Sequence, residues 1–229
     1  MTTSTITLPA RAMADTIHRA LSVMGREDPH PLLEYAHFWT QDGHLLMEAS
    51  DQLRLLRTRT AAVSEDAVDV LVHRLHLSRI AGLVPDKERI PVPVYDYEEA
   101  STVSRDPAEG MEARIIPDES GISVTVGETT LRVPTAPVSD WDRINLAASW
   151  RSHMTSNHVS STAWSPSLIA PLISAVATSE HVIADFREKT TLLTISDHSI
   201  ALICALQYTA SDLPKAAELW PDLLEETSR

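Results

Sequence analysis

The chain has 229 residues, enough for one large domain or two modest domains with hydrophobic cores. It is 43% hydrophobic and 22% charged, as ordinary globular proteins are, and no apolar run is long enough to span a membrane. The net charge of -13 argues against phosphate contact on average, but it does not exclude a local basic patch. The single cysteine excludes an intramolecular disulfide and, with no recognisable signal peptide, predicts a cytoplasmic location.

The first part of the chain predicts a strand, a helix and three more strands. The helix is expected over residues 10–24, where apolar side chains recur at the spacing of one helical face. A strand over residues 4–8 precedes it. Asp42-Gly43 is a favourable pair for a hairpin turn between two of the later strands. These later strands are expected at residues 32–40, 44–50 and 53–60.

The second part of the chain repeats this order. A strand over residues 67–72 leads into a helix over 73–84, which Pro85-Asp86 ends. An edge strand is expected at 90–97, and the acidic segment 98–109 is expected to be a long loop. Three strands follow at residues 113–116, 121–126 and 130–133, with a turn at Gly127-Glu128.

A third part of the same kind is expected after a connector over residues 144–156. This third unit covers residues 157–212, and its helix is expected over 165–178. Its strands are expected at residues 181–186, 191–196 and 200–208. Residues 213–229 predict an acidic tail with a short helix interrupted by Pro221.

The repeat is the most informative feature of the sequence, because one such unit cannot bury its apolar face alone. The chain is therefore expected to be assembled from like parts. Residues 1–143 are interpreted as a complete domain of two units, to which the connector, the third unit and the tail are added.

Three stretches of this pattern resemble the bacterial DNA sliding clamp, the beta subunit family of DNA polymerase III. The first covers residues 8–55 and ends in Asp51-x-x-Arg54-Leu55, which is similar to a motif of that family. The second joins residues 72–85 with 130–134 and 139–141, and the third joins 164–178 with 203–208. Together they cover most of the chain, and their order and spacing carry the resemblance.

The resemblance implies an α+β fold of clamp-like repeats, with antiparallel sheets outside and helices lining the inner face of a ring. It implies a processivity factor for a replicative DNA polymerase, formed as a homo-oligomeric ring around duplex DNA. Contact with phosphates alone gives no sequence preference. A protein that slides along DNA must bind without such a preference. The implied partners are duplex DNA, the polymerase, a clamp loader and further copies of the chain, in a cytoplasmic, nucleoid-associated protein.

The resemblance also implies two sets of functional residues. Polar faces of the first two helices would face DNA, through Arg11, His18, Arg19, Arg26, Arg74, His76 and Arg79. A pocket for client peptides would be formed by Asp51, Arg54, Leu55, Cys204, Leu206 and Tyr208. The pocket is expected to be apolar with a few polar anchors for an extended peptide.

Other classes of function find little support in the sequence. The ten histidines lack an accompanying set of cysteines or carboxylates at ligand spacing, so neither a metal nor a cofactor is expected. Nucleophile-elbow, P-loop and dinucleotide-binding motifs are absent, so no enzyme is expected.

One alternative stays open, because the units number three and the third helix has no Lys or Arg. The chain would then be a clamp-like interaction protein that binds polymerase or clamp partners without encircling DNA, as a regulator or decoy.

Overall fold

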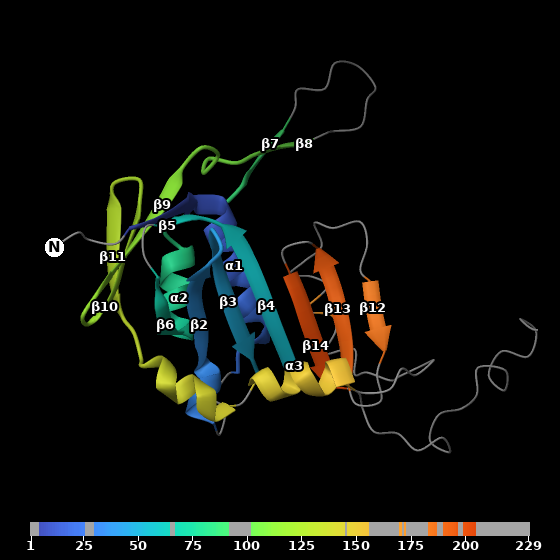
Figure 1. Ribbon diagram of the computed structural model, residues 1–229. Helices are drawn as coiled ribbons and strands as arrows, with labels where there is room; N and C mark the ends of the chain where they lie inside the picture. Colours follow the sequence, from blue (N-terminus) through green and yellow to red (C-terminus); the bar gives the residue numbers. More distant parts are fainter. Residues whose placement is uncertain are drawn as a thin grey trace, which may run out of the picture.

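The computed structural model describes residues 5–25, 30–64, 67–91, 102–144, 146–155, 170, 172, 183–186, 190–196 and 199–204. The fold is α+β, with antiparallel sheets and a few helices (Figure 1). The helices are α1 (Ala10–Val23), α2 (Arg74–Ala81) and α3 (Leu146–Thr155), with 3-10 turns η1 (Pro31–Glu34) and η2 (Val138–Ile144). Within the described ranges, none of these helices is long and apolar enough to cross a membrane.

The strands form three antiparallel sheets. A five-stranded sheet has the order β11 (Thr129–Pro134), β10 (Gly121–Val126), β9 (Glu112–Asp118), β1 (Ile6–Pro9) and β5 (Val63–Ser64). A seven-stranded sheet has the order β12 (Ile183–Phe186), β13 (Thr190–Ser196), β14 (Ser199–Cys204), β4 (Arg54–Ala61), β3 (His44–Ser50), β2 (Tyr35–Gln41) and β6 (Asp69–His73). A separate ribbon joins β7 (Glu88–Pro91) to β8 (Thr102–Arg105).

The first two units exchange their leading strands. Strand β1, which precedes α1, pairs with β9 of the second unit. Strand β6, which precedes α2, pairs with β2 of the first unit. Each sheet therefore contains strands from both units, and neither unit can complete its sheet without the other.

The third part of the chain extends the first unit. Strand β14 pairs with β4 along Ser199 to Ile203, so β12–β14 add to the sheet that begins with β6 and β2. This long-range pairing makes β4 a central strand. Burial alternates along β4 from Leu56 to Ala61, so one face of the strand packs into the core and the other faces outward.

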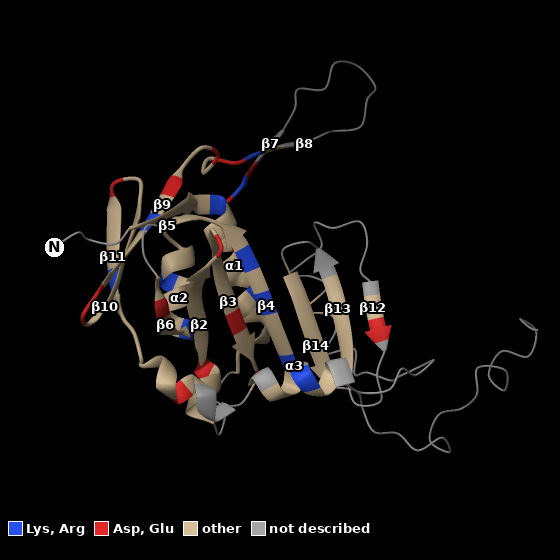
Figure 2. Ribbon diagram, in the orientation of Figure 1, with Lys and Arg blue, Asp and Glu red and all other residues tan. Residues whose placement is uncertain are grey.

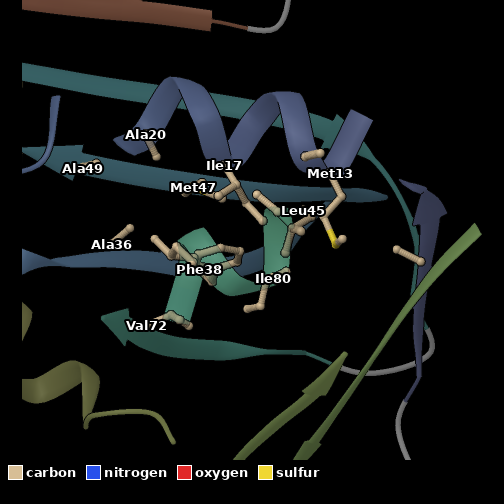
Figure 3. Close-up of a cluster of buried hydrophobic side chains, with 14 of the residues drawn as sticks. Met13, Ile17, Ala20, Ala36, Phe38, Leu45, Met47, Ala49, Val72 and Ile80 are labelled. Carbon is tan, nitrogen blue, oxygen red and sulfur yellow. The ribbon is translucent and has the colours of Figure 1, made fainter. Parts of the chain in front are cut away.

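The main core lies between helices α1 and α2 and the inner faces of the sheets. From α1, Met13 and Ile17 point toward Phe38 and Met47 of the seven-stranded sheet, and Ile80 of α2 joins them (Figure 3). Helices α1 and α2 pack side by side, as the helical periodicity of their buried residues requires.

Several local expectations are confirmed. The loop between β2 and β3 has two residues, Asp42 and Gly43, both with positive φ, between the paired Gln41 and His44. A two-residue hairpin loop with positive φ at both positions matches the twist of the flanking strands. Gly127 also has positive φ in the predicted turn between β10 and β11.

Other expectations need correction. The segment 98–109 was expected to be a loop, but β8 lies within it and pairs with β7. That pairing joins segments with little apolar alternation, so periodicity did not reveal it. The segment 144–156, which is interpreted as a connector, contains a helix, α3, that was not predicted. The helix expected over 73–84 is shorter, because His73 accepts the Leu75 N–H as an N-cap and the helix ends at Ala81.

Some expectations lie outside the described residues. Of the helix expected over 165–178, only residues 170 and 172 are described, and both are helical. The segment 213–229 is outside the described part, and so is the end of the strand expected at 200–208. The division into a two-unit domain, a connector, a third unit and a tail remains a prediction.

Candidate functional site

The turn between β3 and β4 is held together by the carboxylate of Asp51. Its Oδ1 accepts hydrogen bonds from the backbone N–H groups of Leu53 (3.2 Å) and Arg54 (2.8 Å). Its Oδ2 accepts from Nε (2.9 Å) and Nη2 (2.6 Å) of Arg54. The two side chains are only 16% and 11% exposed, so water competes little for this pair.

The same turn contains a strained backbone position. Gln52 has φ of 74°, in the left-handed region that costs a side-chain-bearing residue about 1 kcal/mol. The Oγ of Ser50 accepts the Gln52 N–H (3.2 Å) and donates to the Arg54 carbonyl (2.8 Å). These bonds fix the turn and leave the Leu53 side chain 50% exposed at its tip. The turn is therefore a rigid support for one exposed leucine.

A cavity of about 450 Å³ lies beside this turn. Strand β4 supplies Arg54 and Leu55 to its wall, and Leu202 of β14 lies opposite Leu55 in the paired register. Helix α3 forms a further wall. The complete lining is Leu33, Ser50, Gln52, Leu53, Arg54, Leu55, Leu146, Ala148, Ser149, Ser152, Thr190 and Leu202. An apolar cavity with a few fixed polar groups is the usual form of a small binding site.

Two contacts hold α3 in place against the seven-stranded sheet (Figure 1). At one end, Leu146 packs with Leu55 and Leu202 in a small hydrophobic cluster. At the other end His153 is fully buried, with Nδ1 2.8 Å from the Thr190 hydroxyl and Nε2 3.4 Å from an Asp185 carboxylate oxygen. A buried histidine with polar partners on both ring nitrogens fixes the helix position.

The structure brings together part of the predicted client pocket. Arg54 and Leu55 line the cavity, while Asp51 acts through Arg54 rather than lining it. Cys204 is the last residue of β14, and Leu206 and Tyr208 lie outside the described residues. Sequence reasoning missed Leu53, Leu202 and the α3 wall. The apolar Leu146 in the connector was the signal available for that wall.

The predicted DNA-facing residues lie on α1, α2 and the intervening chain. His18 and Arg79 are exposed, and Arg74 is half-buried. Arg19 is half-buried and donates from Nη1 to the Ser199 hydroxyl (3.1 Å). Arg26 lies outside the described residues. Figure 2 shows basic residues distributed over α1, α2 and β4, not gathered on the helices alone.

Two of the predicted DNA-facing residues, Arg11 and His76, interact with neighbouring groups that affect their charge. Arg11 donates from Nε (2.8 Å) and Nη2 (2.7 Å) to the carboxylate of Asp106, and this bidentate pair lowers the pKa of Asp106. The pKa of His76 is lowered by burial, and further by His73 and Arg79. Arg11 therefore has a carboxylate partner, and burial favours the neutral form of His76 by lowering its pKa.

Within the described ranges, no group of three or more His, Cys, Asp and Glu side chains is arranged to hold a metal ion. No described residues form a nucleophile with a matched acid and base in the cavity beside the turn, whose polar lining consists of Arg54, Gln52 and hydroxyl groups. The cavity can bind apolar groups and hydrogen-bond acceptors.

Comparison with known proteins finds the fold among bacterial sliding clamps. The beta subunit of DNA polymerase III from Thermotoga maritima matches with a TM-score of 0.65 at 10% identity, over 93% of this chain and 68% of that one. The C. crescentus beta sliding clamp gives 0.66 at 11% identity, over 95% and 68%. The Pseudomonas aeruginosa DNA polymerase sliding clamp gives 0.61 at 16% identity, over 89% and 67%.

No protein-family model and no curated protein matches the sequence. At such low identities the structural matches establish the fold alone. The resemblance drawn from the sequence is confirmed at that level, and the chain has the sliding-clamp fold.

Proposed function

We propose that this protein is a sliding-clamp-type processivity factor that holds client proteins through the cavity beside the Asp51–Arg54 turn. The observation that carries the proposal is the position of this cavity. It lies where the clamp-like motif meets the third unit, and it combines leucine walls with one guanidinium. Function must be argued from a site because the fold alone does not imply it.

A client peptide would bind this cavity in an extended form. Its apolar side chains would contact Leu53, Leu146 and Leu202, and an acceptor group would meet Arg54. The rigid turn lowers the entropic cost of binding, because Leu53 and Arg54 are already in place. The client would be a replicative DNA polymerase.

The sheet edges support a ring made of several copies. In the described part, β11 and β12 are outer strands of the two large sheets, and they lie at opposite ends of the molecule (Figure 1). Outer strands carry unpaired backbone groups that can pair with another chain. Pairing β11 of one copy with β12 of the next is a head-to-tail contact, which closes a ring if the rotation permits.

Duplex DNA would pass along the face of α1 and α2, with Arg79 and His18 as its nearest cationic or polar contacts. Arg74 and Arg19 would add to these contacts from half-buried positions. Contacts of this kind are weak and depend on salt, which suits a protein that slides along DNA. The protein would perform no chemistry itself.

Topological linkage to DNA can be tested without a loader. The protein would be threaded onto a linear duplex, both ends would be blocked with biotin–streptavidin, and retention would be measured after a salt wash. We expect retention on the blocked duplex and loss from an open-ended one. Light scattering on a sizing column would give a discrete oligomer. Equal loss from both duplexes, or a monomer at micromolar concentration, would contradict the ring.

The cavity can be tested separately, by primer extension on a circular template with a bacterial replicative polymerase that lacks its own clamp. Leu53→Glu puts a charge at the rim of the cavity, and Val63→Glu is the matched control, since Val63 is 73% exposed on β5 and outside this cavity. We expect Leu53→Glu to abolish stimulation and Val63→Glu to retain it. Equal effects of the two changes would argue against the cavity.

A second function is favoured by one observation, the pairing of Arg11 with Asp106 on the helix side of the molecule. With this guanidinium occupied and a net charge of -13, the helix face has few cations for phosphates. The protein would then be a clamp-like interaction protein that binds polymerase or clamp partners without encircling DNA. A monomer that still binds a polymerase through Leu53 would identify this function.

A further inference from the structure

The described lining of the cavity beside the Asp51–Arg54 turn carries positive but no negative charge. None of the described residues that line it is acidic, although the chain has 32 acidic residues. Its one charged lining residue is Arg54, and within the described residues the Nη1 of Arg54 is buried without a hydrogen-bond partner. A buried donor without a partner is unfavourable, and an acceptor placed beside it relieves that cost. The cavity therefore favours an occupant that is apolar and carries a carboxylate or carbonyl oxygen.

The chain itself continues from the wall of this cavity. Leu202 of β14 lines it, and the next residue, Ile203, is paired with Arg54 of β4. Strand β14 ends at Cys204, one residue further on. The residues that follow β14 therefore begin beside Arg54.

The sequence after β14 has the composition that the cavity favours. Residues 218–226 contain the apolar side chains of Leu219, Trp220, Leu223 and Leu224, together with four carboxylates and no basic residue. Trp220 follows Cys204 by 16 positions, so an extended chain of that length reaches roughly 50 Å. A segment leaving β14 beside Arg54 has ample length to return to the cavity.

We propose that residues 218–226 of the same chain occupy this cavity as an intramolecular competitor of client peptides. Trp220 and the leucines of this segment bury against Leu53, Leu146 and Leu202, and one of its carboxylates accepts a hydrogen bond from Arg54. The inference rests on the proposed client cavity and adds a regulator to it. A tethered segment acts at an effective concentration in the millimolar range, so clients with weaker affinity are excluded until the segment is displaced.

Photo-crosslinking in the full chain tests where the segment lies. Trp220 is replaced by p-benzoylphenylalanine, and the same replacement of Ser211, outside the segment, is the matched control. We expect the Trp220 variant to crosslink within one chain to residues 50–55 or 146–152, and the Ser211 variant not to. Crosslinks to other parts of the chain, or only between two chains, would overturn the proposal.

Binding in trans gives an independent measurement. The probe is a fluorescein-labelled peptide of residues 213–229, titrated into the full chain and into its Trp220→Ala/Leu223→Ala variant. The variant has an emptied cavity, so we expect it to bind the probe at least about tenfold more tightly than the unchanged chain. Adding Leu53→Glu to the variant should remove this binding, and adding Val63→Glu should not. Equal affinity of the unchanged chain and the variant would overturn the proposal.

The failure of this inference can be told apart from failure of the proposed function. Neither the crosslink nor the peptide titration involves DNA, a ring or a polymerase. If the protein is lost from end-blocked DNA but the intramolecular crosslink still forms, the proposed ring is contradicted and the proposed competitor segment is supported. If polymerase stimulation depends on Leu53 but the crosslink does not form, the proposed client cavity is supported and the proposed competitor segment is contradicted.

Discussion

An arginine is paired with an aspartate both at the turn between β3 and β4 and on the face of α1 and α2. The two pairs differ in how far apart the partners lie along the chain. Arg54 is bound by Asp51, three residues before it, and Arg11 is bound by Asp106, 95 residues after it. The first pair lies within one turn and shapes a cavity. The second pair joins the start of α1 to the chain before β9 and occupies an arginine on a face expected to meet phosphates.

The comparison shows that a basic residue on an amphipathic helix is not automatically available to a ligand. At the turn, the ion pair makes a binding surface by fixing the backbone around Leu53. On α1, the ion pair holds two parts of the domain together and reduces the positive charge of the surface. The cavity is therefore the better supported of the two candidate sites.

The largest effect is expected at the turn, from Asp51→Ala. The change removes four hydrogen bonds and leaves the largely buried Arg54 guanidinium without its carboxylate. We expect the free energy of unfolding to fall by about 3 kcal/mol, as measured by urea denaturation. Asp51→Asn, which keeps an acceptor but removes the charge, should cost less. A loss below about 0.5 kcal/mol for Asp51→Ala would show that the pair does not organise the turn.

On the helix face, Arg79→Glu should have the next largest effect. Arg79 is exposed on α2, whereas Arg11 already has a carboxylate partner. We expect Arg79→Glu to weaken binding to duplex DNA by about tenfold and to lower the slope of log affinity against log salt by about 1. Arg11→Gln should change DNA affinity much less. Fluorescence anisotropy at several salt concentrations measures both, and equal effects would remove the distinction between the two arginines.

A smaller effect is expected from Gln52→Gly, which tests the strained position in the turn. Glycine adopts positive φ without the side-chain penalty, although it gains entropy in the unfolded chain. We expect a net stabilisation of about 0.5 kcal/mol in urea denaturation. Glycine at the neighbouring Leu53, which forms the exposed tip, should not stabilise the protein. Destabilisation by Gln52→Gly would mean that the Gln52 side chain contributes more than the strain costs.

The effect of pH should measure what the pair of Arg11 and Asp106 contributes to stability. The Arg11 guanidinium lowers the pKa of Asp106 below its ordinary value of 3.8. The resulting stability is present above about pH 4 and is lost as pH falls through the lower pKa of the folded protein. Arg11→Gln should remove this contribution, so the urea midpoint of the variant should fall less than that of the unchanged protein between pH 7 and about pH 2.5.

The control for this measurement is a group that both proteins share. Ser120 and Arg132 lower the pKa of Asp118 to about 2, and Arg11→Gln leaves that site untouched. The stability lost at low pH through protonation of Asp118 should therefore be the same in both proteins and cancel in the comparison. Parallel curves for the two proteins would show that the pair of Arg11 and Asp106 adds nothing to stability.

Much of the local structure was predictable from the sequence. The hairpin turn at Asp42-Gly43 needs only two residues that tolerate positive φ, and α1 needs only its own apolar periodicity. The Asp51-x-x-Arg54-Leu55 motif, taken from the resemblance to sliding clamps, pointed to the turn beside the cavity, and the bonds that hold this turn are local. Helix α3 was missed because its buried residues face a sheet built from distant strands.

The sequence by itself determined the hairpin turns and the faces of α1 and α2 that pack into the core, because these depend on neighbours a few residues apart. Only the tertiary structure decided that β1 joins β9, that β14 joins β4, and that Arg11 meets Asp106. Each of these contacts joins residues far apart in the chain, and many partners satisfy the same local pattern. Packing of the whole domain selects among these partners. The tertiary structure therefore decides which residues line the cavity and which arginines are paired with a carboxylate.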